Sequence, residues 1–148
     1  MIMNLMKIFN SLIATILFSL VSSQAFAVEF SISAESNFIS MLRPGQKITA
    51  GYMNIIPSED ATIIKIEAKM IGRIEAHSMI MDGEIMKMRK ILPELLKNKK
   101  YQFKSGGDHL MLFDVERDLK GGDDINLLFT FQLKNKKIFS KYIQFKVK

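Results

Sequence analysis

Residues 75–89 read EAHSMIMDGEIMKMR, two alternating runs on either side of Asp82-Gly83. Side chains of different polarity alternate in each run, which is typical of strands in which every second residue faces the same way. Asp-Gly is a strong signal for a two-residue hairpin turn, because both central positions of a type I′ turn require a positive φ. The stretch therefore predicts a β-hairpin with strands at residues 73–81 and 85–91.

A turn centred on Asp82-Gly83 also predicts the register of this hairpin. His77 would lie opposite Met88, and Met79 opposite Met86, with both pairs on one face. Directly opposed residues have Cβ atoms ~4.5–5.5 Å apart, so an imidazole and a thioether could reach one metal ion. A slip of a single residue would send every side chain to the opposite face.

Neither face of the hairpin is purely apolar. The methionine face also carries Glu75 and Lys90, while the opposite face combines Ile80 with Lys87 and Arg89. A strand that packs on a core normally has one face free of charge. We therefore expect the hairpin tip to project beyond the core and to expose its methionine face to solvent or to a neighbouring strand.

The rest of the chain has the same short alternation and no helical period. Further strands are expected at residues 28–33, 47–55, 64–70, 101–104, 109–115, 125–133 and 138–147. Turn-forming dipeptides such as Pro44-Gly45 and Gly106-Gly107 separate these runs. Only Pro93–Lys100 has a sequence compatible with a helix. About nine short strands predict an all-β fold, a Greek-key sandwich or barrel.

The first 27 residues are typical of an export signal, with Lys7, an apolar run over Ile8–Val21 and a small-x-small cleavage site ending at Ala27. The alternative is an uncleaved anchor, but the apolar run is shorter than the ~20 residues of a spanning helix. Cleavage after Ala27 would release the mature protein outside the cytoplasm. Removing 27 of the 148 residues leaves 121, enough for one domain, 28–148, with its own core.

Charge and cysteine content narrow the function classes. Loss of Lys7 lowers the formal net charge from +6 to +5, which favours an acidic partner or transient contact with an anionic membrane surface. Outside the cytoplasm we expect no nucleic-acid partner, and we expect a monomer. The chain has no cysteine, which excludes disulfides, thiolate metal sites, a lipid-attachment cysteine and a blue-copper centre.

The two histidines of the chain, His77 and His109, are each followed two residues later by a methionine. Because of the strand period, His109 and Met111 share a face as His77 and Met79 do. Four donors can then converge: His77, Met88, His109 and Met111. Neutral imidazoles and soft thioethers suit Cu(I) and are poor ligands for calcium, magnesium or manganese. The sequence therefore predicts a Cu(I) site.

Packing is the alternative explanation for these residues, since methionine is a common core filler. Met41, Met53 and Met70 are expected in the core. Asp108 adjoins His109, but the chain has no nucleophile elbow and no metalloprotease helix motif, so we expect no enzyme. The competing function is a metal-free exported β-sandwich that binds a protein or the envelope.

With these residues identified, the chain resembles the periplasmic copper chaperones of the PCu(A)C family, whose motif is His-x10-Met-x21-His-x-Met. His77 and Met88 match its first half, His109 and Met111 match its second half, and the gap between Met88 and His109 is 20 residues instead of 21. Gly51-Tyr-Met-Asn-Ile and Leu127-Leu-Phe-Thr-Phe also resemble the family.

The resemblance implies a cupredoxin-like β-sandwich that binds one Cu(I) and delivers it to cytochrome c oxidase assembly. The recipient would be a copper-accepting oxidase subunit or another copper chaperone. Met79 and Met86 would form an auxiliary sulfur surface beside the primary ligands. The chain departs from the family in Ser105, where proline is usual, and in the missing His/Met-rich tail, so a tail-based Cu(II) site is not expected.

Overall fold

The computed structural model describes residues 29–148, and this part of the chain folds into ten β-strands joined by turns and loops. The strands are β1 Ile32–Ile39, β2 Thr49–Pro57, β3 Ala61–Ala68, β4 Ile71–Asp82, β5 Ile85–Ile91, β6 Glu94–Leu95, β7 Tyr101–Phe103, β8 His109–Val115, β9 Asp124–Leu133 and β10 Ile138–Val147. Among the described residues, no helix is long and apolar enough to span a membrane. The expected signal peptide, residues 1–27, lies outside the described residues.

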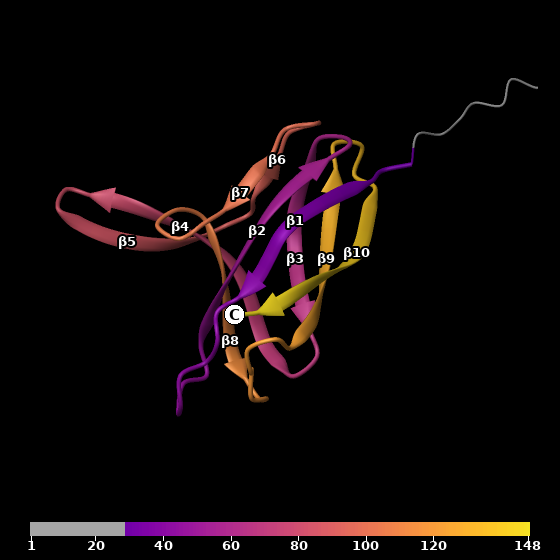
Figure 1. Ribbon diagram of the computed structural model, residues 1–148. Coiled ribbons are helices and arrows are strands. Elements are labelled where there is room, and N and C mark those ends of the chain that lie inside the picture. The colour runs from indigo at the N-terminus through magenta and orange to yellow at the C-terminus, as the bar shows by residue number, and fades with distance from the viewer. Residues whose placement is uncertain (1–28) are drawn as a thin grey trace, which may run out of the picture.

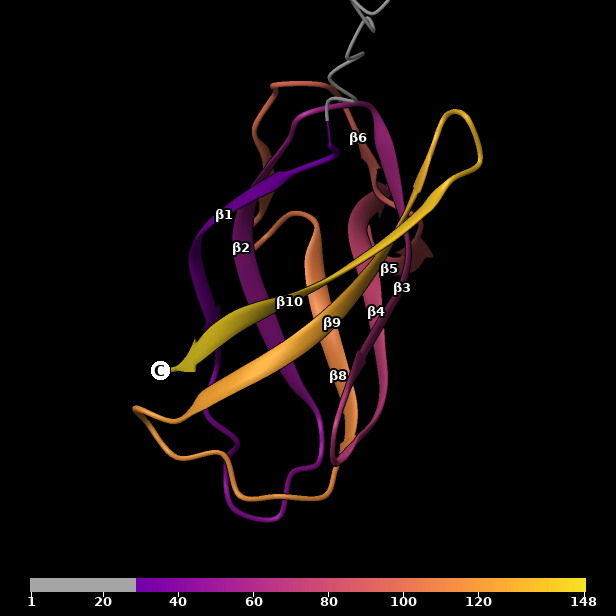
Figure 2. The same ribbon diagram turned by 90° about the vertical axis from the view of Figure 1, so that its right-hand side faces the viewer.

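Seven strands close into a barrel in the order β4-β8-β2-β1-β10-β9-β3, and pairing of β3 with β4 completes the ring. Neighbouring strands are antiparallel except β1 and β10, which run parallel. Three strands lie outside this ring. β5 pairs with the outer half of β4, which projects from the barrel, β6 pairs with β3, and β7 pairs with β2 (Figure 1). Figure 2 shows β9 and β10 crossing the barrel between β1 and β3. The prediction of an all-β barrel or sandwich is confirmed.

The barrel interior is filled by every second residue of its strands. In β9 the buried positions are Ile125, Leu127, Phe129, Phe131 and Leu133. The rings of Phe129 and Phe145 stack with centroids 6.1 Å apart, joining β9 to β10. Full burial of one such side chain contributes about 1.5–3 kcal/mol, so this alternation accounts for the stability of the barrel.

Two predicted elements near the barrel ends are wrong. The first strand occupies Ile32–Ile39 instead of residues 28–33, and a bulge between Glu35 and Phe38 disrupts its alternation. Pro93–Lys100 is not helical, because Leu95 is buried where β6 pairs with Ala61 of β3. A single buried side chain in a two-residue strand leaves no periodic signal in the sequence.

The core methionines were predicted correctly in only one of three cases. Met53 on β2 is 1% exposed and packs in the core. Met41 and Met70 are 53% and 48% exposed, so their prediction as core residues is wrong. Met70 has a φ of +63° in the turn between β3 and β4, which ends the alternation on which its placement depended.

Candidate metal-binding site

The β4–β5 hairpin forms as predicted but with a different turn. Asp82 pairs with Ile85, so Gly83 and Glu84 are the two central residues. Gly83 has a φ of +65°, whereas Asp82 is not among the residues with positive φ. Glycine at the first central position is the pattern of a type II′ turn, which an L residue at that site adopts only with strain. The predicted type I′ turn at Asp82-Gly83 is therefore wrong.

This turn moves the register of the hairpin by two residues. His77 pairs with Lys90, Met79 with Met88 and Met81 with Met86, in place of the predicted pairs of His77 with Met88 and Met79 with Met86. A shift of two preserves the face of every side chain. The histidine and the hairpin methionines thus share one face as expected, while Met88 becomes a diagonal neighbour of His77.

The hairpin projects from the barrel, as expected from its mixed faces (Figure 1). Every residue of β5 except Ile91 is exposed. The exposed fractions of Met81, Met86 and Met88 are 63%, 59% and 56%. Its methionine face is therefore open to solvent instead of packed on a core.

The two histidines face each other across β4 and β8. His77 pairs with His109 in the antiparallel ladder, and the centroids of their rings are 6.3 Å apart. The adjacent pair, Ala76 and Leu110, points to the other side of the sheet, into the core, and these residues are 4% and 0% exposed. Barrel packing on one side of the sheet therefore holds the two imidazoles together on the other side.

The two predicted methionine ligands lie on different sides of this histidine pair. Met111 follows His109 on the same face, pairs with Glu75 and is half-buried. Met88 lies on β5 opposite Met79, one cross-strand pair farther out than His77. The structure thus brings His77, His109 and Met111 together on β4 and β8, and places Met88 at the solvent-exposed side of the group.

His109 is held by the loop that precedes it. Its Nδ1 lies 2.9 Å from the carbonyl oxygen of Gly107, and the residue is 6% exposed. Because a carbonyl only accepts hydrogen bonds, Nδ1 carries the proton and donates it. In the neutral ring, Nε2 then has a free lone pair for a metal, the arrangement in which a backbone carbonyl orients a ligating histidine.

The loop between β7 and β8 is itself fixed by polar contacts. The Tyr101 hydroxyl donates to the Asp108 carboxylate, and the Lys104 amide donates to the Asp108 carbonyl at 2.7 Å. Burial, together with the Asp108 carboxylate, raises the pKa of Tyr101, so this phenol stays protonated and remains a donor. These bonds position the Gly107 carbonyl that orients His109.

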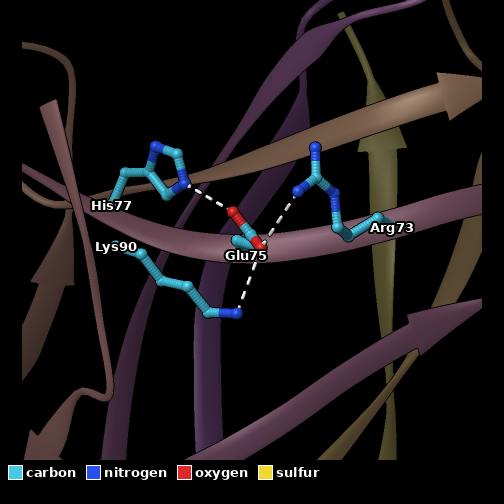
Figure 3. Close-up of polar contacts among 4 residues, drawn as sticks. All are labelled: Arg73, Glu75, His77 and Lys90. Atoms are coloured by element: carbon cyan, nitrogen blue, oxygen red, sulfur yellow. Dashed lines mark hydrogen bonds and ion pairs between the residues drawn. The ribbon is translucent and has the colours of Figure 1, made fainter.

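His77 is oriented by a carboxylate. Its Nε2 lies 2.9 Å from Oε2 of Glu75, whose side chain is 11% exposed (Figure 3). Lys90 and Arg73 donate to the other carboxylate oxygen at 3.1 and 3.4 Å. The hydrogen bonds from His77 and Lys90 hold the pKa of Glu75 below its usual value, so Glu75 is an anion at neutral pH. The carboxylate accepts a hydrogen bond from Nε2–H of His77 and leaves Nδ1 free, pointing away from Glu75 (Figure 3).

An aromatic side chain supports the same network from β8. Phe113 lies with its ring centroid 5.9 Å from that of His77, and the Arg73 guanidinium sits 4.2 Å above the same ring. Arg73 therefore contacts both Glu75 and Phe113. A cation over an aromatic face is attracted by about 0.5–1 kcal/mol at exposed sites. This attraction helps to hold Arg73 beside Glu75.

Three residues of this arrangement were not assigned a role from the sequence. Glu75 could have been found, because it precedes His77 by two residues and so shares its face. Phe113 follows His109 by four residues on β8 and shares its face for the same reason. The Gly107 carbonyl carries no sequence signal, because its direction depends on the loop conformation.

The donor set limits the metals that the site suits. Among residues 29–148, no three histidine, aspartate or glutamate side chains gather in a way that could hold a metal ion. The histidine pair would need thioethers such as Met111 and Met88 to complete a coordination shell. Imidazole and thioether donors favour soft, electron-rich ions.

Solved structures with the same fold are PCuAC domains. The apo PCuAC domain from PmoF1 superposes with a TM-score of 0.61 at 13% identity, covering 79% of this chain and 94% of that domain. The copper-bound PCuAC domain from PmoF2 gives 0.59 at 13% identity, covering 79% and 93%. CuI-DR1885 from Deinococcus radiodurans gives 0.53 at 22% identity, covering 86% and 83%. The predicted resemblance to this fold is confirmed.

The sequence comparisons identify a family. Protein RP573 of Rickettsia prowazekii (strain Madrid E) is 34% identical over 94 residues, which are 61% of this chain and 52% of that protein. The match thus spans about half the length of that relative. The model of the LpqE-like family, whose description names a lipoprotein, matches residues 26–139. The chain belongs to the LpqE-like family.

Proposed function

We propose that this protein is an exported copper chaperone that binds one Cu(I) through His77, Met88, His109 and Met111. The observation that carries the proposal is the opposed pair His77 and His109, in which each ring has one nitrogen engaged by an acceptor and the other free. Histidines that bind metals are usually oriented in this way. Methionines on the same face supply the remaining donors.

The chemistry of these donors favours Cu(I) over Cu(II). All four proposed ligands are neutral, and the nearby anion Glu75 is occupied by His77, Lys90 and Arg73. Without an anionic ligand the site offers little to stabilise the higher charge of Cu(II). Thioethers need no deprotonation and form no disulfides, so they suit an oxidising compartment, although oxidation to sulfoxide would destroy them.

The comparisons support copper as the bound metal. Two of the solved domains that share the fold are described as copper-bound or CuI forms. In this proposal the chain is a binding protein and not an enzyme, as expected from the sequence. At identities of 13% and 22%, these solved domains show a shared fold and no more. The ligands proposed here therefore rest on this chain's own residues.

Exposure of the site supports delivery of the ion to another protein. Met88 is 56% exposed and Met86, an auxiliary donor with Met79, is 59% exposed. An incoming ligand can therefore reach the ion without unfolding the barrel. The recipient in this proposal is a copper-accepting oxidase subunit, or another copper chaperone, in the periplasm after cleavage at Ala27. The family name refers to a lipoprotein, but this 148-residue chain has no cysteine to carry a lipid.

A metal-free envelope-binding protein is the second candidate. It is favoured by the exposed apolar side chains of the hairpin, among them Ile85 and Met81, each 63% exposed. Exposed apolar surface of this kind often marks a contact with another protein. This candidate predicts no Cu(I) binding and no effect of copper on stability.

Anaerobic titration of residues 28–148 with Cu(I) against a chromophoric chelator tests the proposal. We expect one tight equivalent, weakened at least tenfold in His77→Ala and in Met88→Leu, which corresponds to a loss of about 1.4 kcal/mol or more. Met41→Leu is the matched control, because Met41 is exposed but lies beside Gly121, outside the site. Failure to compete with the chelator would refute the proposal and favour the metal-free candidate.

A further inference from the structure

We infer that the hairpin tip holds a second Cu(I) site, made only of the thioethers of Met79, Met81 and Met86. The inference rests on the proposed function for the identity of the ion. It differs from the primary site in its residues and in having no histidine. Three neutral sulfur donors are a coordination set that selects Cu(I) among the common biological metals.

The observed register brings these three sulfurs together. Met81 pairs directly with Met86 across the hairpin, and Met79 precedes Met81 by two residues on the same face. Directly opposed residues have Cβ atoms ~4.5–5.5 Å apart, and diagonal neighbours ~7–8 Å. Each methionine sulfur lies two bonds beyond Cβ on a flexible chain, so all three can turn toward one ion.

Their surroundings leave this sulfur surface accessible to solvent. Met81 and Met86 are 63% and 59% exposed, and Met79 is half-buried. The nearby lysines are engaged elsewhere. Lys87 lies on the opposite face and binds Asp82 at 2.5 Å, and Lys90 binds Glu75 at 3.1 Å. Neither ammonium group is free to repel a cation at the tip.

Packing does not explain these methionines. The hairpin stands away from the barrel (Figure 1), and the burial of β5 shows no core-facing side. Methionine in a core fills gaps between other apolar side chains, a role that needs neighbours on both sides. At the tip the methionine face has solvent instead, so these thioethers are open to a metal ion.

The pair of Met79 and Met88 joins the two sites. Met88 belongs to the primary ligand set, and it lies directly opposite Met79 of the tip. An ion can move inward by exchanging one thioether for the next, with one Cu–S bond forming as another breaks. The copper remains Cu(I) and no proton is transferred, because every donor in the exchange is neutral. The tip thus serves as the entry and exit point for the histidine site.

The inference is tested by NMR titration of residues 28–148, labelled with [methyl-¹³C]methionine, with Cu(I) added under anaerobic conditions. We expect the first equivalent to shift the methyl signals of Met88 and Met111. A second, weaker equivalent should shift those of Met81 and Met86. In the double variant Met81→Leu, Met86→Leu the second equivalent should be lost and the first retained, whereas Met41→Leu should keep both.

The outcomes separate this inference from the proposed function. One equivalent that leaves the Met81 and Met86 signals unmoved, even with excess Cu(I), overturns the second site and leaves the histidine site standing. In the double variant His77→Ala, His109→Ala, loss of the tight equivalent with retained shifts at Met81 and Met86 supports both sites. If that variant binds as tightly as the wild type, the primary site is refuted while the tip site remains supported.

Discussion

The barrel strand β9 and the hairpin strand β5 carry the same alternating pattern but use it differently. In β9 the alternation separates core from surface, with Leu127, Phe129 and Phe131 fully buried. In β5 both faces are exposed, and Met86 and Met88 alternate with the charged side chains of Lys87 and Arg89 instead of with surface positions above a core. Stability therefore resides in the barrel, whereas the hairpin contributes exposed thioethers to the proposed copper sites, so the two roles can be tested separately.

The largest expected effect is on the barrel side of this comparison. Phe129→Ala removes a fully buried ring that stacks on Phe131 and Phe145, and should reduce the free energy of unfolding by about 3–5 kcal/mol. Met86→Ala on the exposed hairpin should change it by less than about 0.5 kcal/mol. Urea denaturation measures both. Equal losses would show that the hairpin packs against another surface in solution.

Bound Cu(I) should make the metal-site residues contribute to the free energy of unfolding, as the barrel core does without metal. Cu(I) at 100 times its dissociation constant should raise the free energy of unfolding by about 2.7 kcal/mol, because it binds only the folded chain. The increase should fall in the variant His77→Ala, His109→Ala to what the weaker tip site contributes, and should persist in full in Met41→Leu. Thermal unfolding with and without Cu(I) under argon provides the measurement. An increase of undiminished size after loss of both histidines contradicts the primary site.

Removal of the carboxylate behind His77 should have a smaller effect. Glu75→Ala frees the ring of His77, and loss of such an orienting group typically weakens metal affinity by about 10–100-fold. Glu75→Gln keeps an oxygen that can accept from Nε2, so it should restore part of the affinity. Chelator competition gives the affinities, and ¹⁵N chemical shifts of His77 report its tautomer. An unchanged tautomer in Glu75→Ala would show that Glu75 does not orient the ring.

The smallest expected effect is a pH dependence of the metal-free protein. The pKa of Glu75 is lowered in the folded state by its hydrogen bonds to His77 and Lys90. A lowered pKa contributes stability that is present above the unfolded value, 4.5, and is lost as the pH falls from there through the folded value. Urea unfolding of wild type and Glu75→Gln at a series of pH values should show a steeper acid loss for the wild type. Parallel curves would mean that these bonds contribute nothing to folding.

Period-two alternation made much of the molecule predictable. It identified the all-β fold and most strands, and it placed His77, Met79 and Met88 on one face. That placement survived a wrong turn, because the register moved by two residues and not by one. The alternation failed where a bulge interrupts it, as in β1 near Glu35, and where a strand is too short to show a period, as at Leu95.

The sequence by itself therefore determined which donors exist and which of them share a face, because side-chain direction along a strand depends only on local backbone geometry. Only the tertiary structure decided that His77 and His109, which are distant in the sequence, lie opposite each other. It also decided that Glu75 and the Gly107 carbonyl each accept a hydrogen bond from one ring N–H. Those relations arise when the barrel closes and pairs β4 with β8, a non-local event that no local pattern specifies.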